Sequence, residues 1–174
     1  MAVDTFVKAT DNKYPLLSYE KESDWKGSFC FIQSADTQLG LIDSWNGVPE
    51  DEQKWEKEIA LTHKAIAAAN LLSPKPRFFV VCGDLVNAFP WHRYNDGQVQ
   101  DFKEVFKELD PSIPLVCVCG NHDVGDIPTA DSVSKYRRNF GDDYFSFWVG
   151  GKNRNCKQKR ITIYLKLFFS ERRV

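Results

Sequence analysis

Four short apolar runs along the chain have the length of β-strands. The first alternates before it becomes apolar, the second and third are continuous apolar runs, and the fourth is rich in aromatic residues. Continuous apolar runs of this length are typical of strands that are buried on both faces of a sheet. The pattern predicts strands at residues 28–35, 77–82, 115–119 and 144–149.

The segments between these runs have the periodicity of amphipathic helices. Apolar positions recur at intervals of three and four over residues 50–72 and again over residues 102–109, and prolines follow both segments. A shorter, polar helix is expected over residues 131–139. Because strands alternate with helices, we expect an α/β fold whose sheet is at least partly parallel.

Metal-competent side chains follow each of the first three predicted strands. Asp36 and Gln38 follow the first, Gly83-Asp84 the second, and Gly120-Asn121-His122-Asp123 the third. In open α/β sheets, functional groups gather beyond the carboxyl ends of the strands, and glycine lets the backbone approach an ion closely. A single Gly-Asp pair is usually only a turn, but the ordered series after three strands favours a metal site.

With these motifs the chain resembles the calcineurin-like metallophosphoesterases, whose pattern is Asp-x-His, Gly-Asp and Gly-Asn-His-Asp or -Glu, followed by later histidines. Residues 141–148 add to the match, which looks closest to a family member described as a serine/threonine protein phosphatase. The resemblance covers about residues 20–151. It implies the N-terminal half of a four-layer α/β/β/α sandwich, with a mixed sheet, flanking helices and a largely missing second sheet.

The resemblance also implies metal-dependent hydrolysis of a phosphate ester, with a phosphorylated protein as substrate. Two divalent ions, Mn, Mg, Fe or Zn, would be bound, with Asp84 bridging them, Asp36 on the first and Asn121 on the second. His122 would stabilise charge on the phosphate or protonate the leaving oxygen. Asp123 would hold the other ring nitrogen of His122, unless it is a simple turn cap.

Several nearby residues depart from the family pattern or allow two interpretations. Gln38 stands where the family has histidine, and its amide suits harder ions such as manganese or magnesium better than zinc. Asn87 is interpreted either as a residue that supports the metal ligands or as an ordinary loop residue. His92 is a candidate substrate contact, whereas His63 is expected to be a solvated or packing histidine of the first helix.

The later part of the chain departs further from the family pattern. No histidine follows Asp123, and residues 152–174 contain eight Lys and Arg against one Asp or Glu, whereas residues 1–151 contain 15 against 23. We expect an N-terminal leader (1–24), the N-terminal half of a phosphoesterase domain (25–151) and a divergent basic tail (152–174). Our hypothesis is that this tail is translated intron in a truncated isoform.

Three functions follow from these observations. The first is a phosphoprotein phosphatase that is inactive or weakly active in this form, because histidines of the family site are missing. The second is a phosphodiesterase or nucleotide hydrolase of the same superfamily, and the third is a non-catalytic fragment. A metal titration would separate the third from the other two.

Composition limits the partners and the compartment. The acidic body has no basic stripe of the kind that nucleic-acid binding needs. The five cysteines lack a disulfide-framework pattern, and four of them are expected to pack as buried hydrophobic residues. We expect no membrane association, because no apolar stretch has the length of a membrane span or the features of a signal peptide. A cytoplasmic protein is the expectation.

Overall fold

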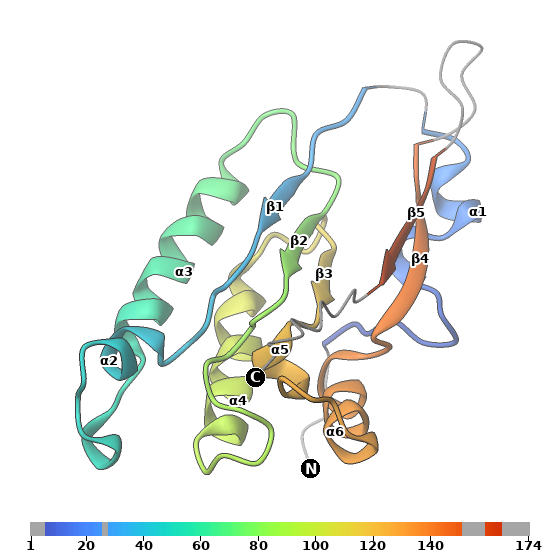
Figure 1. The fold of residues 1–174 in the computed structure, drawn as a ribbon. Coiled ribbons are helices and arrows are strands. Elements are labelled where there is room, and N and C mark those ends of the chain that lie inside the picture. The colour runs from blue at the N-terminus through green and yellow to red at the C-terminus, as the bar shows by residue number, and fades with distance from the viewer. Residues whose placement is uncertain (1–5, 26–27, 151–158, 165–174) are drawn as a thin grey trace, which may run out of the picture.

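Three parallel strands form the centre of the structure (Figure 1). The computed structural model describes residues 6–25, 28–150 and, for the backbone alone, 159–164. The strands lie side by side in the order of the sequence, and helical segments connect each to the next. They are β1 (Ile32–Ser34), β2 (Phe79–Cys82) and β3 (Leu115–Val118). This parallel order confirms the predicted α/β class.

Helices cover one face of the parallel sheet, and a second sheet lies on the other (Figure 1). The covering helices are α3 (Glu56–Asn70) and α4 (Asn95–Val105), which continues into η3 (Phe106–Glu108). The second sheet pairs β4 (Tyr144–Val149) with β5 (Lys159–Tyr164) in antiparallel orientation. The shorter elements are η1 (Pro15–Leu17), α1 (Tyr19–Glu22), α2 (Leu41–Trp45), η2 (Glu50–Glu52), α5 (Asn121–Val124) and α6 (Ala130–Phe140).

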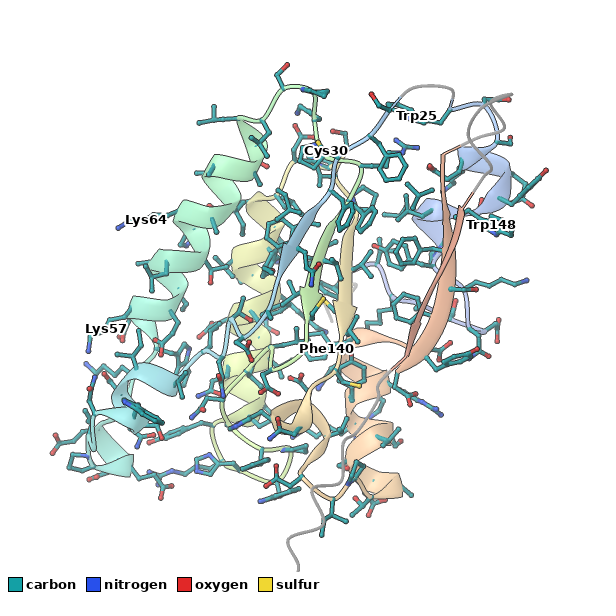
Figure 2. All side chains as sticks on the ribbon, turned by 45° about the horizontal axis from the view of Figure 1, so that its top comes forward. Trp25, Cys30, Lys57, Lys64, Phe140 and Trp148 are labelled. Carbon is teal, nitrogen blue, oxygen red and sulfur yellow. The ribbon has the colours of Figure 1, made fainter. Side chains whose placement is uncertain are left out.

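The alternation of side chains along β2 creates two hydrophobic cores. Phe79 and Val81 point to the helical face and pack with a cluster that includes Phe102. Phe78 and Val80 point to the opposite face, where they join a cluster from the second sheet. Figure 2 shows side chains filling both spaces. A strand of period two with two apolar faces therefore holds the layers together.

Two predicted elements are shorter in the structure than in the sequence pattern. β1 has only three residues, because it lies at the sheet edge and its pairing with β2 begins at Ile32 opposite Phe79. The first long helix begins at Glu56, not at residue 50. The segment before it is bonded to α2, since the backbone N–H of Lys54 donates to Asp43 Oδ2 at 3.0 Å.

Other features were not predicted. The segment over Lys159–Tyr164, assigned to the basic tail, forms a strand in which Ile161 lies opposite Phe147. Cys30 and Cys82 are exposed, so their predicted role in core packing is wrong, whereas Cys117 and Cys119 are buried as expected. Cys156 lies outside the described residues. Among the helices that the structure describes, none has the length and apolar character to cross a membrane.

Candidate metal centre

The loops that follow the three parallel strands meet at the carboxyl edge of the sheet. The backbone N–H of Asp36 donates to the Gly83 carbonyl at 3.1 Å, and that of Gln38 donates to the Asp84 carbonyl at 3.0 Å. The parallel pairing of β1 and β2 therefore continues beyond the strand ends. The third loop joins them through His122 N, which donates to Asp84 Oδ1 at 2.9 Å. Four predicted site residues, Asp36, Gln38, Asp84 and His122, are thus brought together.

The backbone at this edge is strained. Asp36, Gln38 and Asp84 have φ values of 55°, 39° and 49°, in the left-handed region that side chains other than glycine rarely adopt. This conformation costs about 1–2 kcal/mol for each residue, somewhat less for aspartate, whose short polar side chain tolerates it. Strained residues that cluster in one place point to a functional site.

Two glycines allow the second and third loops to approach each other. A Cβ atom on Gly83, which has φ +85°, would lie 3.0 Å from Gly120 Cα. A Cβ atom on Gly120 would overlap Asp84 Oδ1 and Asp84 N. The backbone of Gly120 therefore forms the cradle in which the Asp84 carboxylate lies.

Asp36 and Asp84 place two negative charges next to each other. Partial burial and the Asp84 carboxylate raise the pKa of Asp36, and His122 opposes that shift. Among the described residues, no lysine or arginine forms an ion pair with either carboxylate. Two adjacent carboxylates without a protein cation are a suitable donor set for a divalent metal ion.

The donor chemistry fits hard divalent cations. The described residues contain no cluster of three or more His, Cys, Asp or Glu that could hold a metal. The predicted set instead combines the carboxylates of Asp36 and Asp84 with the amide oxygen of Asn121. Oxygen donors of this kind suit manganese or magnesium. The residues present would therefore hold part of a metal site.

The ring of His122 is fixed by two contacts that the sequence did not reveal. Its Nδ1 lies 2.5 Å from the backbone carbonyl of Asn87. Since a carbonyl can only accept, Nδ1 carries the proton and Nε2 is the nitrogen available for a substrate. The ring also stacks on Phe89, with centroids 4.7 Å apart and planes within 9°.

Asp123 does not hold the ring of His122, so that prediction is wrong. Its buried carboxylate accepts the N–H of Gly120 at 2.8 Å and the N–H of Leu85 at 3.0 Å. These bonds turn it toward the loop after β2, away from the imidazole. Burial raises the pKa of Asp123 to about 7, the Asp84 charge adds to the rise, and the two N–H donors oppose it. Asp123 acts as a turn cap that ties the two loops together.

Asn121 is oriented by a second unpredicted residue. Its Nδ2 donates to Asp126 Oδ1 at 2.8 Å, and Asn121 is an exposed residue. Because the amide nitrogen is committed to Asp126, the amide oxygen is the atom left to face a cation. No short-range motif would reveal Asp126, since its role depends on the turn that ends α5.

Gln38 and Asn87 lie together beside this cluster. Gln38 Nε2 donates weakly to Asn87 Oδ1 at 3.5 Å, and the Gln38 side chain is buried. Asn87 contacts the site through its carbonyl on His122, which favours the interpretation that it supports the ligands. The metal contact proposed for Gln38 stays a prediction.

The two other histidines are engaged elsewhere. His92 Nδ1 accepts the N–H of Tyr94 at 3.2 Å, and its Nε2 lies 3.4 Å from Glu50 Oε1. The structure therefore shows no contact between His92 and the strand-end cluster. His63 pairs with Glu108 at 2.7 Å on the surface of α3, as expected for a solvated histidine.

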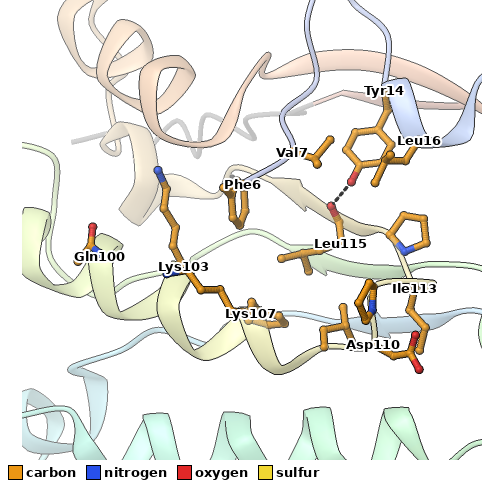
Figure 3. A pocket seen from close by; sticks show the side chains of 14 residues that line it. Phe6, Val7, Tyr14, Leu16, Gln100, Lys103, Lys107, Asp110, Ile113 and Leu115 are labelled. Carbon is orange, nitrogen blue, oxygen red and sulfur yellow. Dashed lines mark hydrogen bonds between the residues drawn. The ribbon is translucent and has the colours of Figure 1, made fainter. Parts of the chain in front are cut away.

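A cavity of about 580 Å³ lies at the opposite end of β3 from this cluster (Figure 3). It is bordered by Phe6, Leu16, Lys107 and Leu115, and Tyr14 Oη donates to the Leu115 carbonyl at 2.6 Å. None of the predicted site residues lines it. The cavity is therefore separate from the candidate site, whose residues lie at the carboxyl edge of the sheet.

Comparison with known proteins agrees with this geometry. The calcineurin-like phosphoesterase family matches residues 31–169, which runs past Gly151 into the segment assigned to the tail. Serine/threonine-protein phosphatase CPPED1 from Homo sapiens is 53% identical over 134 residues, which cover 76% of this chain and 43% of the relative. The Danio rerio protein of that name is 47% identical over 155 residues, covering 87% and 50%. The Mus musculus protein is 49% identical over 152 residues, covering 86% and 49%.

These matches confirm the resemblance that the motifs indicated. The chain spans about half the length of the curated relatives it matches. The family match itself covers most of the chain, including all three strand-end motifs. The chain belongs to the calcineurin-like phosphoesterase family.

Proposed function

We propose that this chain carries the first part of the metal site of a phosphatase that hydrolyses phosphoserine or phosphothreonine in proteins. One observation carries the proposal. The strained loops after β1, β2 and β3 bring Asp36 and Asp84 together beside His122, and no lysine or arginine among the described residues pairs with either carboxylate. Such a cluster is suited to a divalent ion.

The carboxylates and Asn121 would hold the metal ions. When bound, two divalent ions supply a hydroxide nucleophile near neutral pH and positive charge for the phosphoryl oxygens. Asp84 would be shared by the two ions, Asp36 would hold the first and Asn121 the second. Asp126 orients the Asn121 amide, and Gly120 leaves room for the Asp84 carboxylate.

His122 would act on the leaving group. The Asn87 carbonyl keeps a proton on Nδ1, so Nε2 can donate its own proton only when the ring is the imidazolium cation. The face of Phe89 supports that ring, with centroids 4.7 Å apart. General acid catalysis of this kind contributes about 100- to 10,000-fold to a rate.

Hydrolysis should need imidazoles beyond His122. His63 and His92 pair with Glu108 and Glu50, and the sequence contains no other histidine. A site with an incomplete ligand set loses the geometry that holds two metal ions. We therefore expect the chain alone to hydrolyse phosphoesters weakly or not at all.

The substrate proposal comes from the relatives, whose names describe serine/threonine-protein phosphatases. The residues discussed above would contact only the phosphoryl group, so a phosphodiester or nucleotide remains the competing substrate. Hydrolysis rates for a phosphoserine peptide, a nucleoside monophosphate and a phosphodiester would distinguish these substrate classes.

The direct test joins residues 1–151 of this chain to the C-terminal half of the human relative. We expect manganese-dependent hydrolysis of a phosphoserine peptide by this fusion and little by the 174-residue chain. Asp84→Asn in the fusion should reduce the rate to background, and His122→Ala should reduce kcat by about 100- to 10,000-fold.

Asp51→Asn is the matched control, because Asp51 is an exposed aspartate of η2. It should leave the rate unchanged. Circular dichroism spectra should establish that every variant is folded. An active fusion whose rate survives Asp84→Asn would overturn the proposal, and so would robust, Asp84-dependent turnover of nucleotides without turnover of phosphopeptides.

A further inference from the structure

Three aromatic rings form a continuous stack that begins at His122. The His122 ring lies parallel to Phe89, with centroids 4.7 Å apart and planes within 9°. Phe89 lies parallel to Trp91, with centroids 5.1 Å apart and planes within 3°. The stack therefore leads from the proposed general acid outward to Trp91.

Trp91 is exposed, although the two rings behind it are half-buried. Its relative exposure is 68%, and Phe89 provides its only ring contact among the described residues. One face of the indole is covered by Phe89, so the opposite face is open to solvent. An exposed tryptophan at the end of an ordered stack differs from a scattered surface apolar residue.

The turn after α5 lies close to the six-membered ring of the indole. A Cβ atom on Gly125 would lie 3.0 Å from the Trp91 ring and 3.5 Å from the Ile127 carbonyl oxygen. Ile127 is 75% exposed. Trp91 and this turn thus form an apolar margin that is continuous with the candidate metal centre, because α5 also carries Asn121 and His122.

We propose that the open face of Trp91 is a platform for an aromatic side chain of the phosphoprotein substrate. The inference rests on the proposed function and deepens it, since it adds a sequence preference near the phosphorylated residue. Aromatic rings prefer offset-stacked partners, and Trp91 offers a large, rigid face for that contact. The platform would select among phosphopeptides without touching the reacting atoms.

The spacing of the stack predicts where this side chain lies. The two centroid spacings place the Trp91 ring at most about 10 Å from His122, and a ring on its outer face adds about 4.5–7 Å. An extended chain advances about 3.3–3.6 Å per residue. Allowing for the reach of both side chains, the aromatic residue lies roughly two to four positions from the phosphorylated residue.

Charge near Trp91 favours a neutral ring over a nucleotide. Arg93 pairs with Glu50 at 3.2 Å, and Lys135 pairs with Asp96 at 2.8 Å. Arg93 lies two residues after Trp91, and Lys135 donates to the Pro90 carbonyl, so both basic residues near the platform already have acidic partners. They leave little positive charge for additional phosphates, as a nucleoside di- or triphosphate would require.

The test is an NMR titration of the 174-residue chain with Mg²⁺ and phosphoserine peptides. The peptides carry phenylalanine or alanine two to four residues from the phosphoserine. We expect the best phenylalanine peptide to bind about two- to tenfold more tightly than its alanine partner. Trp91→Ala should remove this preference, and Trp91→Phe, which keeps a ring, should retain part of it.

Trp45→Ala is the matched control, because Trp45 is 84% exposed on α2 and makes no ring contact within the described residues. It should leave the preference intact. A preference that survives Trp91→Ala, equal affinities, or no measurable binding of either peptide would overturn the inference. So would Trp91-dependent binding of adenosine monophosphate in place of the peptides. If the fusion hydrolyses no phosphopeptide but the Trp91-dependent preference persists, the proposed function fails and the platform stands.

Discussion

The two ends of β2 differ in how their acidic side chains are neutralised. Arg77 lies before the strand and Asp84 lies after it. At the amino end a buried carboxylate is fully neutralised by protein groups. At the carboxyl end two carboxylates lie close enough to repel each other, and no lysine or arginine among the described residues pairs with either. The comparison separates a charge pair that holds the fold together from one that is suited to a ligand.

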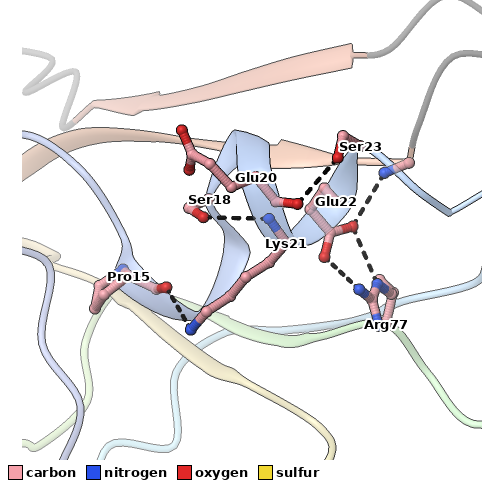
Figure 4. Close-up of polar contacts among 8 residues, drawn as sticks. Pro15, Ser18, Glu20, Lys21, Glu22, Ser23 and Arg77 are labelled. Atoms are coloured by element: carbon pink, nitrogen blue, oxygen red, sulfur yellow. Dashed lines mark hydrogen bonds and ion pairs between the residues drawn. The ribbon is translucent and has the colours of Figure 1, made fainter.

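At the amino end, a buried ion pair and its hydrogen bonds connect segments that are distant in the sequence; we call this network the closed tie (Figure 4). Glu22 of α1 is fully buried, and both of its oxygens bind the Arg77 guanidinium. Glu22 Oε2 also accepts the N–H of Gly150 at 3.1 Å, and Arg77 lies over the Trp25 ring at 4.7 Å. Every charge has a partner, so this site has no need of an ion.

The carboxyl end keeps its charges unneutralised and its backbone strained. Asp36 and Asp84 both have positive φ, and their mutual repulsion contributes to the raised pKa of Asp36. A fold optimised only for stability would place a lysine here or remove a carboxylate. The difference teaches that stability and function make opposite demands on similar acidic residues.

Breaking the tie at the amino end should have the largest effect on stability. Glu22→Gln should lower the free energy of unfolding by about 3 kcal/mol, because it leaves the Arg77 charge poorly compensated. Urea unfolding of the 174-residue chain measures this change. Glu20→Gln on the same helix is the control, since that side chain is exposed. Equal stability of the two variants would contradict the closed tie.

Crowding the cradle at the carboxyl end should have an intermediate effect. Gly120→Ala would place Cβ against Asp84 Oδ1 and should cost about 1–3 kcal/mol through overpacking. Gly97→Ala in α4 is the control, because its Cβ would lie at an ordinary 3.5 Å from Trp55. Gly97→Ala should raise the free energy of unfolding by roughly 0.5–1 kcal/mol, because alanine has a higher helix propensity than glycine. If denaturation curves showed the same change in stability for both variants, the close packing of Gly120 against Asp84 would be contradicted.

Removing one of the opposed charges should have the smallest effect, with the opposite sign. Asp36→Asn should stabilise the metal-free chain by a few tenths of a kcal/mol, since Asp36 is exposed and its repulsion with the half-buried Asp84 is partly screened. Asparagine also tolerates the left-handed backbone. The gain should shrink at high salt, whereas Asp51→Asn should show no gain. A clear loss of stability in Asp36→Asn would argue against repulsion at this edge.

Much of the fold was readable because its strands are short, apolar and followed by turns. The strand over 144–149 matches β4 completely, and the strand pattern over 115–119 differs from β3 by one residue. Edge pairing and the start of α3 were less accurate, because they depend on contacts between distant segments. β5 was missed because its basic surroundings concealed the alternating residues 161–164.

The sequence predicted which residues form the candidate site, but it did not predict the contacts that hold them in place. The motifs placed Asp36, Asp84 and Asn121 at strand ends, whereas the hydrogen bonds of His122 and Asp123 required the fold. The Asn87 carbonyl offers no sequence signal, since every residue has one. The aromatic pair Phe89 and Trp91 was visible in the chain, but its stacking on His122 was not.

The central claim is that the carboxyl edge of the sheet is built to hold a cation. A calorimetric titration of the 174-residue chain with manganese tests it most directly, with Asp84→Asn and the control Asp51→Asn titrated in parallel. The account predicts a single weak site that Asp84→Asn removes and Asp51→Asn retains, because the chain supplies only part of the ligand set. Two tight sites, no binding at all, or binding that Asp84→Asn leaves unchanged would contradict it.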